Sequence, residues 1–143
     1  MTVPVWMLLA FAVWTLLLLL GTIGVYRWSR ILAGKAPIGS FRADLVEGAD
    51  WYVRAMRAHA NCVENLPVFA AIVLALHAGN VATPLIDALA IIIVIARVLQ
   101  SLTHVCFVQS DRVVAVRFLF FFAQIVCFLW LAAIIAFAYA MTA

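Results

Sequence analysis

The segment RAMRAHANCVENLP, residues 54–67, places polar and charged side chains at the start of a long apolar run. At about 100° per residue, a helix brings Arg54, Arg57, Asn61 and Glu64 onto one face. The face then carries guanidinium donors, an amide and an acid, which are groups that can hold a small charged molecule through charge-assisted hydrogen bonds. We take this face as the first candidate binding surface.

Two later segments carry shorter polar faces. Arg97, Ser101 and His104 share one helical face. Arg117 and Gln124 lie seven residues apart and share another. A charged side chain at the centre of a membrane-spanning helix costs about 2.5–3.5 kcal/mol on insertion scales, so such residues are expected to face protein or water. We therefore expect the three polar faces to converge on one cleft that opens toward the cytoplasm.

The simplest structural explanation of these charges is a Glu64–Arg97 ion pair that joins two helices, with Asn61 forming a hydrogen bond between them. The charges of the whole set do not balance, however. The set contains one acid, Glu64. Its positive residues are more numerous: Arg54, Arg57, Arg97 and Arg117. A surplus of guanidinium groups beside one acid indicates a site for an anion that carries carboxylates and an amine.

The composition predicts the elements that position these residues. Of the 143 residues, 69% are hydrophobic and 10% are charged, whereas about a quarter are charged in soluble domains. Four predicted helices, at about 4–26, 50–77, 84–108 and 113–140, each exceed the roughly 20 residues that cross a bilayer. We expect an all-α integral membrane four-helix bundle in a single domain, residues 1–143. The first helix is expected to be a retained anchor, because its apolar stretch exceeds the roughly 7–15 residues of a signal core and no basic residue precedes it.

Lysine and arginine are distributed unevenly along the chain. Six fall in or beside the first connection and two flank the third, whereas the amino terminus, the second connection and the carboxyl tail have none. By the positive-inside rule, the first and third connections face the cytoplasm and both termini face away. This asymmetry accounts for the net charge of +3 without a nucleic-acid partner. We expect a multi-pass protein of a bacterial inner membrane.

The three cysteines indicate neither a metal site nor a disulfide framework. Cys62, Cys106 and Cys127 lie in predicted spans at unrelated spacings. We expect them to act as small packing residues, and we expect no metal cofactor.

The extended segment RAMRAHANCVENLPVF resembles the signature of the MAPEG family, the membrane-associated proteins in eicosanoid and glutathione metabolism. The matching positions have the family's spacing and are Arg57, Ala58, His59, Asn61 and Glu64. Arg97 and Arg117 match the arginines expected on the third and fourth helices. The chain length, the four spans and the basic first connection also agree.

The resemblance implies a homotrimer that binds glutathione, as a co-substrate, in clefts between adjacent subunits. The implied glutathione-binding residues are Arg30, Arg54, Arg57, Asn61, Glu64, Arg97 and His104. Glu64 would face the amino group of the tripeptide, and either Arg27 or Arg30 would supply the contact from the end of the first helix. Arg117 would lie near the sulfur and is the expected catalytic residue.

The implied activity is that of a glutathione transferase or peroxidase acting on hydrophobic electrophiles that arrive from the lipid. A neighbouring guanidinium favours the nucleophilic thiolate. Family enzymes often carry tyrosines where this chain has His104 and Phe120 or Phe121. Two alternatives remain: a non-catalytic trimeric membrane protein that binds an anionic lipid or small anion through the same arginines, and a small proton-coupled exporter. The long first connection and the arginine surplus argue against the exporter.

Overall fold

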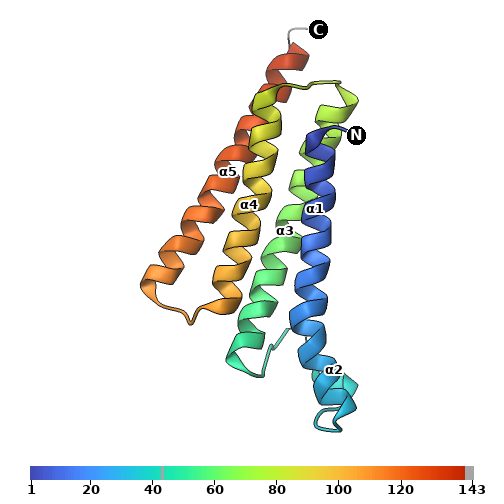
Figure 1. Ribbon diagram of the computed structural model, residues 1–143, viewed down its shortest axis with the longest axis vertical. Helices are drawn as coiled ribbons and strands as arrows, with labels where there is room; N and C mark the ends of the chain where they lie inside the picture. Colours follow the sequence, from blue (N-terminus) through green and yellow to red (C-terminus); the bar gives the residue numbers. More distant parts are fainter. Residues whose placement is uncertain (43, 141–143) are drawn as a thin grey trace.

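The computed structural model describes residues 1–42 and 44–140. Four long helical spans run side by side with connections at alternating ends (Figure 1). The second to fourth spans are α3 (Asp50–Ala78), α4 (Pro84–Cys106) and α5 (Asp111–Ala140). All four spans are long and apolar enough to cross a membrane, and the described residues include no β-strand. The prediction of an all-α, four-helix membrane protein is confirmed.

The first span is one continuous helix in three parts: α1 (Val3–Leu18), the π-helical segment η1 (Leu19–Gly24) and α2 (Val25–Leu32). It extends past the predicted end near residue 26, because loss of apolar character marks where a helix leaves the membrane and not where it ends. The helix ends in a Schellman motif. The amide of Lys35 donates to the Arg30 carbonyl at 2.9 Å, and Gly34 has a φ of 67°.

Capping side chains mark the starts of α4 and α5. Thr83 accepts a hydrogen bond from the amide of Ile86 at 3.3 Å and caps the start of α4. Ser110 accepts from the amide of Val113 at 3.4 Å, so α5 begins two residues before its predicted start. A short 3-10 helix, η2 (Ile38–Ser40), lies in the first connection.

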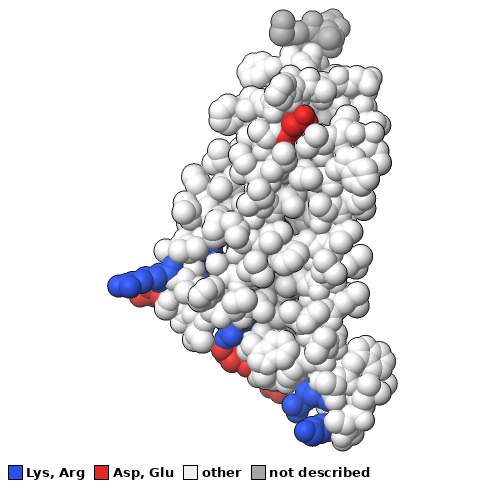
Figure 2. Space-filling view, in the orientation of Figure 1, with Lys and Arg blue, Asp and Glu red and all other residues white. Residues whose placement is uncertain are grey.

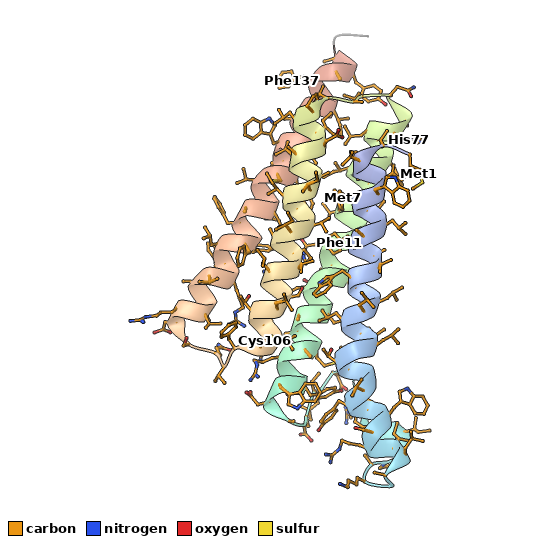
Figure 3. All side chains as sticks on the ribbon, in the orientation of Figure 1. Met1, Met7, Phe11, His77, Cys106 and Phe137 are labelled. Atoms are coloured by element: carbon orange, nitrogen blue, oxygen red, sulfur yellow. The ribbon has the colours of Figure 1, made fainter. Side chains whose placement is uncertain are left out.

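The interior of the bundle is apolar in its upper part. α4 contacts α1, α3 and α5, and its Ile86 and Ile93 are fully buried. The ring of Phe69 on α3 lies 5.9 Å from the ring of Phe11 on α1 and 6.0 Å from that of Phe128 on α5, measured between centroids. Figure 3 labels Phe11 on α1. The aromatic contacts therefore link α3 to α1 and α5, while α4 packs against all three.

Lysine and arginine side chains gather at one end of the molecule. The Val3 end of α1 and the Ala140 end of α5 lie at the upper end with the second connection, and the first and third connections lie at the lower end (Figure 1). Lysine and arginine side chains are seen only along the lower edge of the visible face (Figure 2). The arrangement has the basic asymmetry on which the predicted membrane orientation rests.

Aromatic side chains fix the first connection, residues 33–49, against α3. The ring of Tyr26 stacks on that of Tyr52 at a centroid distance of 4.1 Å, and the Tyr26 hydroxyl accepts a hydrogen bond from the amide of Ala49 at 3.1 Å. Arg27 Nε donates to the Tyr52 hydroxyl at 2.9 Å. Gly48 has a φ of 147°, and a Cβ there would lie 2.6 Å from the Tyr26 hydroxyl oxygen. Glycine is therefore required at this position by both backbone conformation and space.

We expect Gly48→Ala to lower the free energy of unfolding by about 1–3 kcal/mol, because it strains the backbone and displaces the Tyr26 hydroxyl. Thermal unfolding in detergent, together with the rate of proteolysis within residues 33–49, measures the effect. The matched control is Gly39→Ala, since no heavy atom lies within 4 Å of a Cβ built at Gly39. Equal unfolding temperatures and cleavage rates for the two variants would contradict this account of the connection.

Candidate functional site

One polar residue from each of α3, α4 and α5 lies at about the same depth along the bundle. A hydrocarbon core takes about 20 helical residues to cross, and that count from the upper ends of α3, α4 and α5 reaches His59, Thr103 and Phe121. Arg57, His104 and Arg117 each lie within about one helical turn below these positions. Figure 3 labels Cys106, two residues beyond His104, at the lower end of α4. The candidate site is therefore at the lower membrane boundary.

A cleft of about 380 Å³ opens among the lower parts of α3, α4 and α5. Its polar lining comes from all three helices and the third connection, and consists of Arg57, Asn61, Gln100, His104, Gln109 and Arg117. Its apolar lining comes from α5 alone and consists of Val114, Phe118 and Phe121. The polar faces predicted on the three helices thus share this cleft, which has a charged side and an aromatic side.

His104 links α5 to α3 at the centre of the cleft. Arg117 Nη1 donates to His104 Nδ1 at 2.9 Å, and Asn61 Nδ2 lies 3.4 Å from His104 Nε2. A guanidinium only donates hydrogen bonds, so Nδ1 must be the unprotonated nitrogen and the proton of the neutral ring lies on Nε2. The oxygen of the Asn61 amide accepts from that N–H when the amide nitrogen and oxygen exchange places. Arg117 thereby sets both the orientation and the tautomer of His104.

Gln100 is held by a second polar contact beside the cleft. Gln124 Nε2 donates to Gln100 Oε1 at 3.1 Å and to the Phe120 carbonyl at 2.9 Å. Because the carbonyl of the Gln100 amide is already engaged, its Nε2 group remains as a donor toward the cleft. The cleft is consequently richer in donors than in acceptors.

Two arginines leave the cleft with uncompensated positive charge. Within residues 1–42 and 44–140, neither Arg57 nor Arg117 forms an ion pair with an acid. Arg54, by contrast, pairs with Asp50 one turn earlier on α3 and donates from Nη2 to the Val105 carbonyl at 3.3 Å. An anion in the cleft would therefore meet the free charges of Arg57 and Arg117.

Glu64 and Arg97 lie elsewhere, which differs from the expectation that they share a cleft. Glu64 is exposed on the outer face of α3 and does not line the cleft. Arg97 is 1% exposed and faces α1, with its guanidinium carbon 5.6 Å from the centroid of the Phe11 ring. No Glu64–Arg97 ion pair joins them in the part of the chain that the structure describes. Residues that helical spacing places on one face, such as Arg97 and His104, therefore meet different neighbours.

The arginines at the end of the first span also lie outside the cleft. Arg27 donates to the Tyr52 hydroxyl, and Arg30 lies over the ring of Tyr26 at 5.4 Å from its centroid. Arg30 lines a separate hollow below α2. Within one chain, the cleft is lined by Arg57, Asn61, His104 and Arg117 of the expected set. It is not lined by the other expected residues, which are Arg30, Arg54, Glu64 and Arg97.

Five side chains of the cleft are not among the expected site residues: Gln100, Gln109, Val114, Phe118 and Phe121. Gln109 lies in the predicted third connection, and its position just beyond α4 puts it at the depth of His104. Phe118 and Phe121 belong to an aromatic run on α5. The signal that identifies Phe121 is its spacing, because it follows Arg117 by four residues and so shares its helical face.

The described residues contain no group of three or more His, Cys, Asp or Glu side chains that could hold a metal ion. No curated protein and no solved structure matches the chain. The sequence profile of the MAPEG family does match, over residues 4–137, which is almost the whole chain. Together with four membrane-spanning helices and a polar cleft at the membrane boundary, this match shows that the chain belongs to the MAPEG family, whose members act in eicosanoid and glutathione metabolism.

Proposed function

We propose that this protein binds glutathione in the cleft and transfers it, as a thiolate, to hydrophobic electrophiles. The observation that carries the proposal is the pair of uncompensated guanidinium groups, Arg57 and Arg117, on either side of His104 in a cleft with one aromatic wall. Membership of the MAPEG family supports glutathione as the anion. A peroxidase reaction at the same thiolate is the other activity that the family resemblance implies.

The charged side of the cleft suits the peptide part of glutathione. Arg57 is exposed toward the cleft and can form a bidentate pair with a carboxylate. The amide groups of Asn61 and Gln100 can hydrogen-bond the peptide groups of the ligand. These contacts would bind glutathione equally before and during reaction, so they should govern affinity more than rate.

Arg117 is the proposed activating residue. A free thiol has a pKa of about 8.5, and a nearby guanidinium favours its deprotonated form. Arg117 is only 8% exposed and is held by its bond to His104, so its charge is fixed in position before the ligand binds. His104 would act through Arg117, by holding the guanidinium in place beside the sulfur.

The aromatic side of the cleft suits the acceptor. Phe118 and Phe121 form an apolar wall next to Arg117, and Phe118 is 65% exposed on the surface of α5. A lipophilic molecule could therefore reach the sulfur from the hydrocarbon without crossing the charged side. This division favours conjugation to apolar electrophiles over water-soluble ones.

Glu64 supports a homotrimer with shared sites. Counting about 20 residues back from Ala78 puts Glu64 inside the hydrocarbon core, where an exposed carboxylate is costly. A neighbouring copy of the chain would cover it, and Glu64 could then meet the ammonium group of glutathione in a site shared between copies. By the positive-inside rule such sites open to the cytoplasm.

We expect Arg57→Gln to raise the Kd for glutathione about 10- to 100-fold, because charge-assisted hydrogen bonds contribute about 1.5–3 kcal/mol. Calorimetric titration of the purified protein in detergent measures Kd. Arg112→Gln is the control, since Arg112 is exposed and does not line the cleft. No heat from the unaltered protein at millimolar glutathione would reject glutathione as the ligand and leave an anionic lipid as the occupant of the cleft.

We expect Arg117→Gln to abolish the ultraviolet absorbance of bound thiolate and to lower kcat about 100-fold or more, with the Kd for glutathione changed less than about threefold. The loss of a fixed charge next to the sulfur explains the difference between rate and affinity. Difference spectroscopy at saturating glutathione gives the thiolate signal. An unchanged thiolate absorbance in this variant would remove Arg117 from the activating role.

Shared sites can be tested by mixing inactive copies. We expect Glu64→Gln and Arg117→Ala chains to be weakly active alone, and oligomers co-assembled from equal amounts to regain about a quarter of the normal activity. A site that takes Glu64 from one copy and Arg117 from the next is intact in some of the mixed oligomers. Activity no higher than the mean of the two separate variants would contradict sharing, and native mass spectrometry of the same samples gives the number of copies.

A further inference from the structure

A second hollow, of about 320 Å³, lies between α2 and the first connection. Its walls include Tyr26 and Arg30 from α2 and Lys35 and Glu47 from the connection. It shares no residue with the cleft. The hollow therefore presents two cations, Arg30 and Lys35, and one acid, Glu47, to a ligand.

One wall of the hollow is held in a defined position. Tyr26 is 9% exposed, stacks on Tyr52 and accepts the hydrogen bond from Ala49. Gly48, whose missing side chain makes room for the Tyr26 hydroxyl, also lines the hollow. The Arg30 guanidinium lies 5.4 Å from the centroid of the Tyr26 ring, within the range of a cation–π contact. The wall of Tyr26 and Arg30 is consequently ordered before any ligand binds.

The three charged side chains of the hollow are not paired with one another. Arg30, Lys35 and Glu47 are exposed, and no ion pair between them is present in the described part of the chain. Arg42, in the same connection, is paired instead: its guanidinium holds the pKa of Asp44 below the ordinary value. Two free cations and one free acid around a single hollow complement a ligand that carries a phosphate and an ammonium group.

The position of the hollow indicates where such a ligand comes from. Val25, Trp28 and Leu32 of α2 follow an i, i+3, i+7 spacing and are all exposed on one face. Ile38 and Leu45 of the connection are 72% and 56% exposed. Exposed apolar and aromatic side chains beside basic ones are typical of a segment that lies in the membrane–water boundary. The charged lower edge in Figure 2 includes this end of the molecule.

We propose that the hollow binds the headgroup of a bilayer phospholipid of the phosphatidylethanolamine type. Arg30 and Lys35 hold the phosphate, and Glu47 accepts hydrogen bonds from the primary ammonium group. The quaternary ammonium of phosphatidylcholine has no N–H to donate and binds less well. The hollow and the cleft share no lining residue, but Arg30 is also an arginine for which the family resemblance implies a glutathione contact.

Native mass spectrometry of the full-length protein tests the proposal, with equimolar phosphatidylethanolamine, phosphatidylcholine and phosphatidylglycerol of identical acyl chains. We expect phosphatidylethanolamine to be retained about tenfold more than phosphatidylcholine, the difference of roughly one charge-assisted hydrogen bond. The double substitution Arg30→Gln with Lys35→Gln should lower retention of phosphatidylethanolamine about tenfold. Glu47→Gln should remove the preference over phosphatidylcholine and keep the phosphate contact.

Arg42→Gln is the matched control, because it removes a cation of the same connection that does not line the hollow, and it should retain phosphatidylethanolamine as the unaltered protein does. Equal retention of the three lipids, or a double variant that binds like the unaltered protein, would overturn the proposal. A separate titration of delipidated protein with soluble phosphoethanolamine distinguishes the source of the phosphate. Millimolar binding of that soluble compound, or displacement of lipid by it at equal concentration, would assign the hollow to a soluble phosphate ester instead.

Discussion

The arrangement of this protein depends on one constraint: hydrocarbon offers a guanidinium group neither water nor a counter-ion. Eight of the nine lysine and arginine residues belong to the lower helix ends or to the connections between them, and Arg97 is the exception. Arg97 is accommodated by burial against the Phe11 ring, and its Nε and Nη2 atoms have no hydrogen-bond partner among the described residues. The upper interior can then be mainly apolar, and the lysine and arginine side chains other than Arg97 are confined to a layer at the lower boundary.

Within that layer, the two candidate sites hold different basic residues, and these residues differ in how firmly they are positioned. In the cleft, Arg117 is hydrogen-bonded to His104 and is only 8% exposed, so the position of its charge is fixed. In the hollow below α2, Arg30 lies over the Tyr26 ring, and both Arg30 and Lys35 are exposed. Arg27 and Arg54 are already engaged, with Tyr52 and Asp50 respectively. Apart from the exposed Arg112, the basic residues at the lower end therefore take part in packing, in ion pairs or in sites with room for an anion.

The fold was predictable because a membrane imposes strong rules on sequence. Uncharged stretches of sufficient length gave the four spans, and helical spacing gave the polar faces of α3, α4 and α5. The directions of those faces were not predictable, because a spacing rule relates residues within a helix and says nothing of its rotation against neighbours. Glu64 and Arg97 show this, since one faces outward and the other faces α1. The stacking of Tyr26 on Tyr52 likewise depends on how a connection of irregular structure folds back. The roles of Arg57, Asn61, His104 and Arg117 stay predictions.

The π-helical segment Leu19–Gly24 sets the rotation of the lower half of the first span relative to the upper half. Because a π turn contains more residues than an α turn, the segment rotates α2 about the helix axis relative to α1 without breaking the helix. Phe11 above it packs on Phe69, and Tyr26 below it packs on Tyr52, both on α3. A uniform α-helix of the same sequence would advance the lower half by an additional fraction of a turn and move one of these aromatic residues off its partner. The π-helical segment thus allows Phe11 inside the membrane and Tyr26 at its boundary, both on one long helix, to contact the same neighbouring helix, α3.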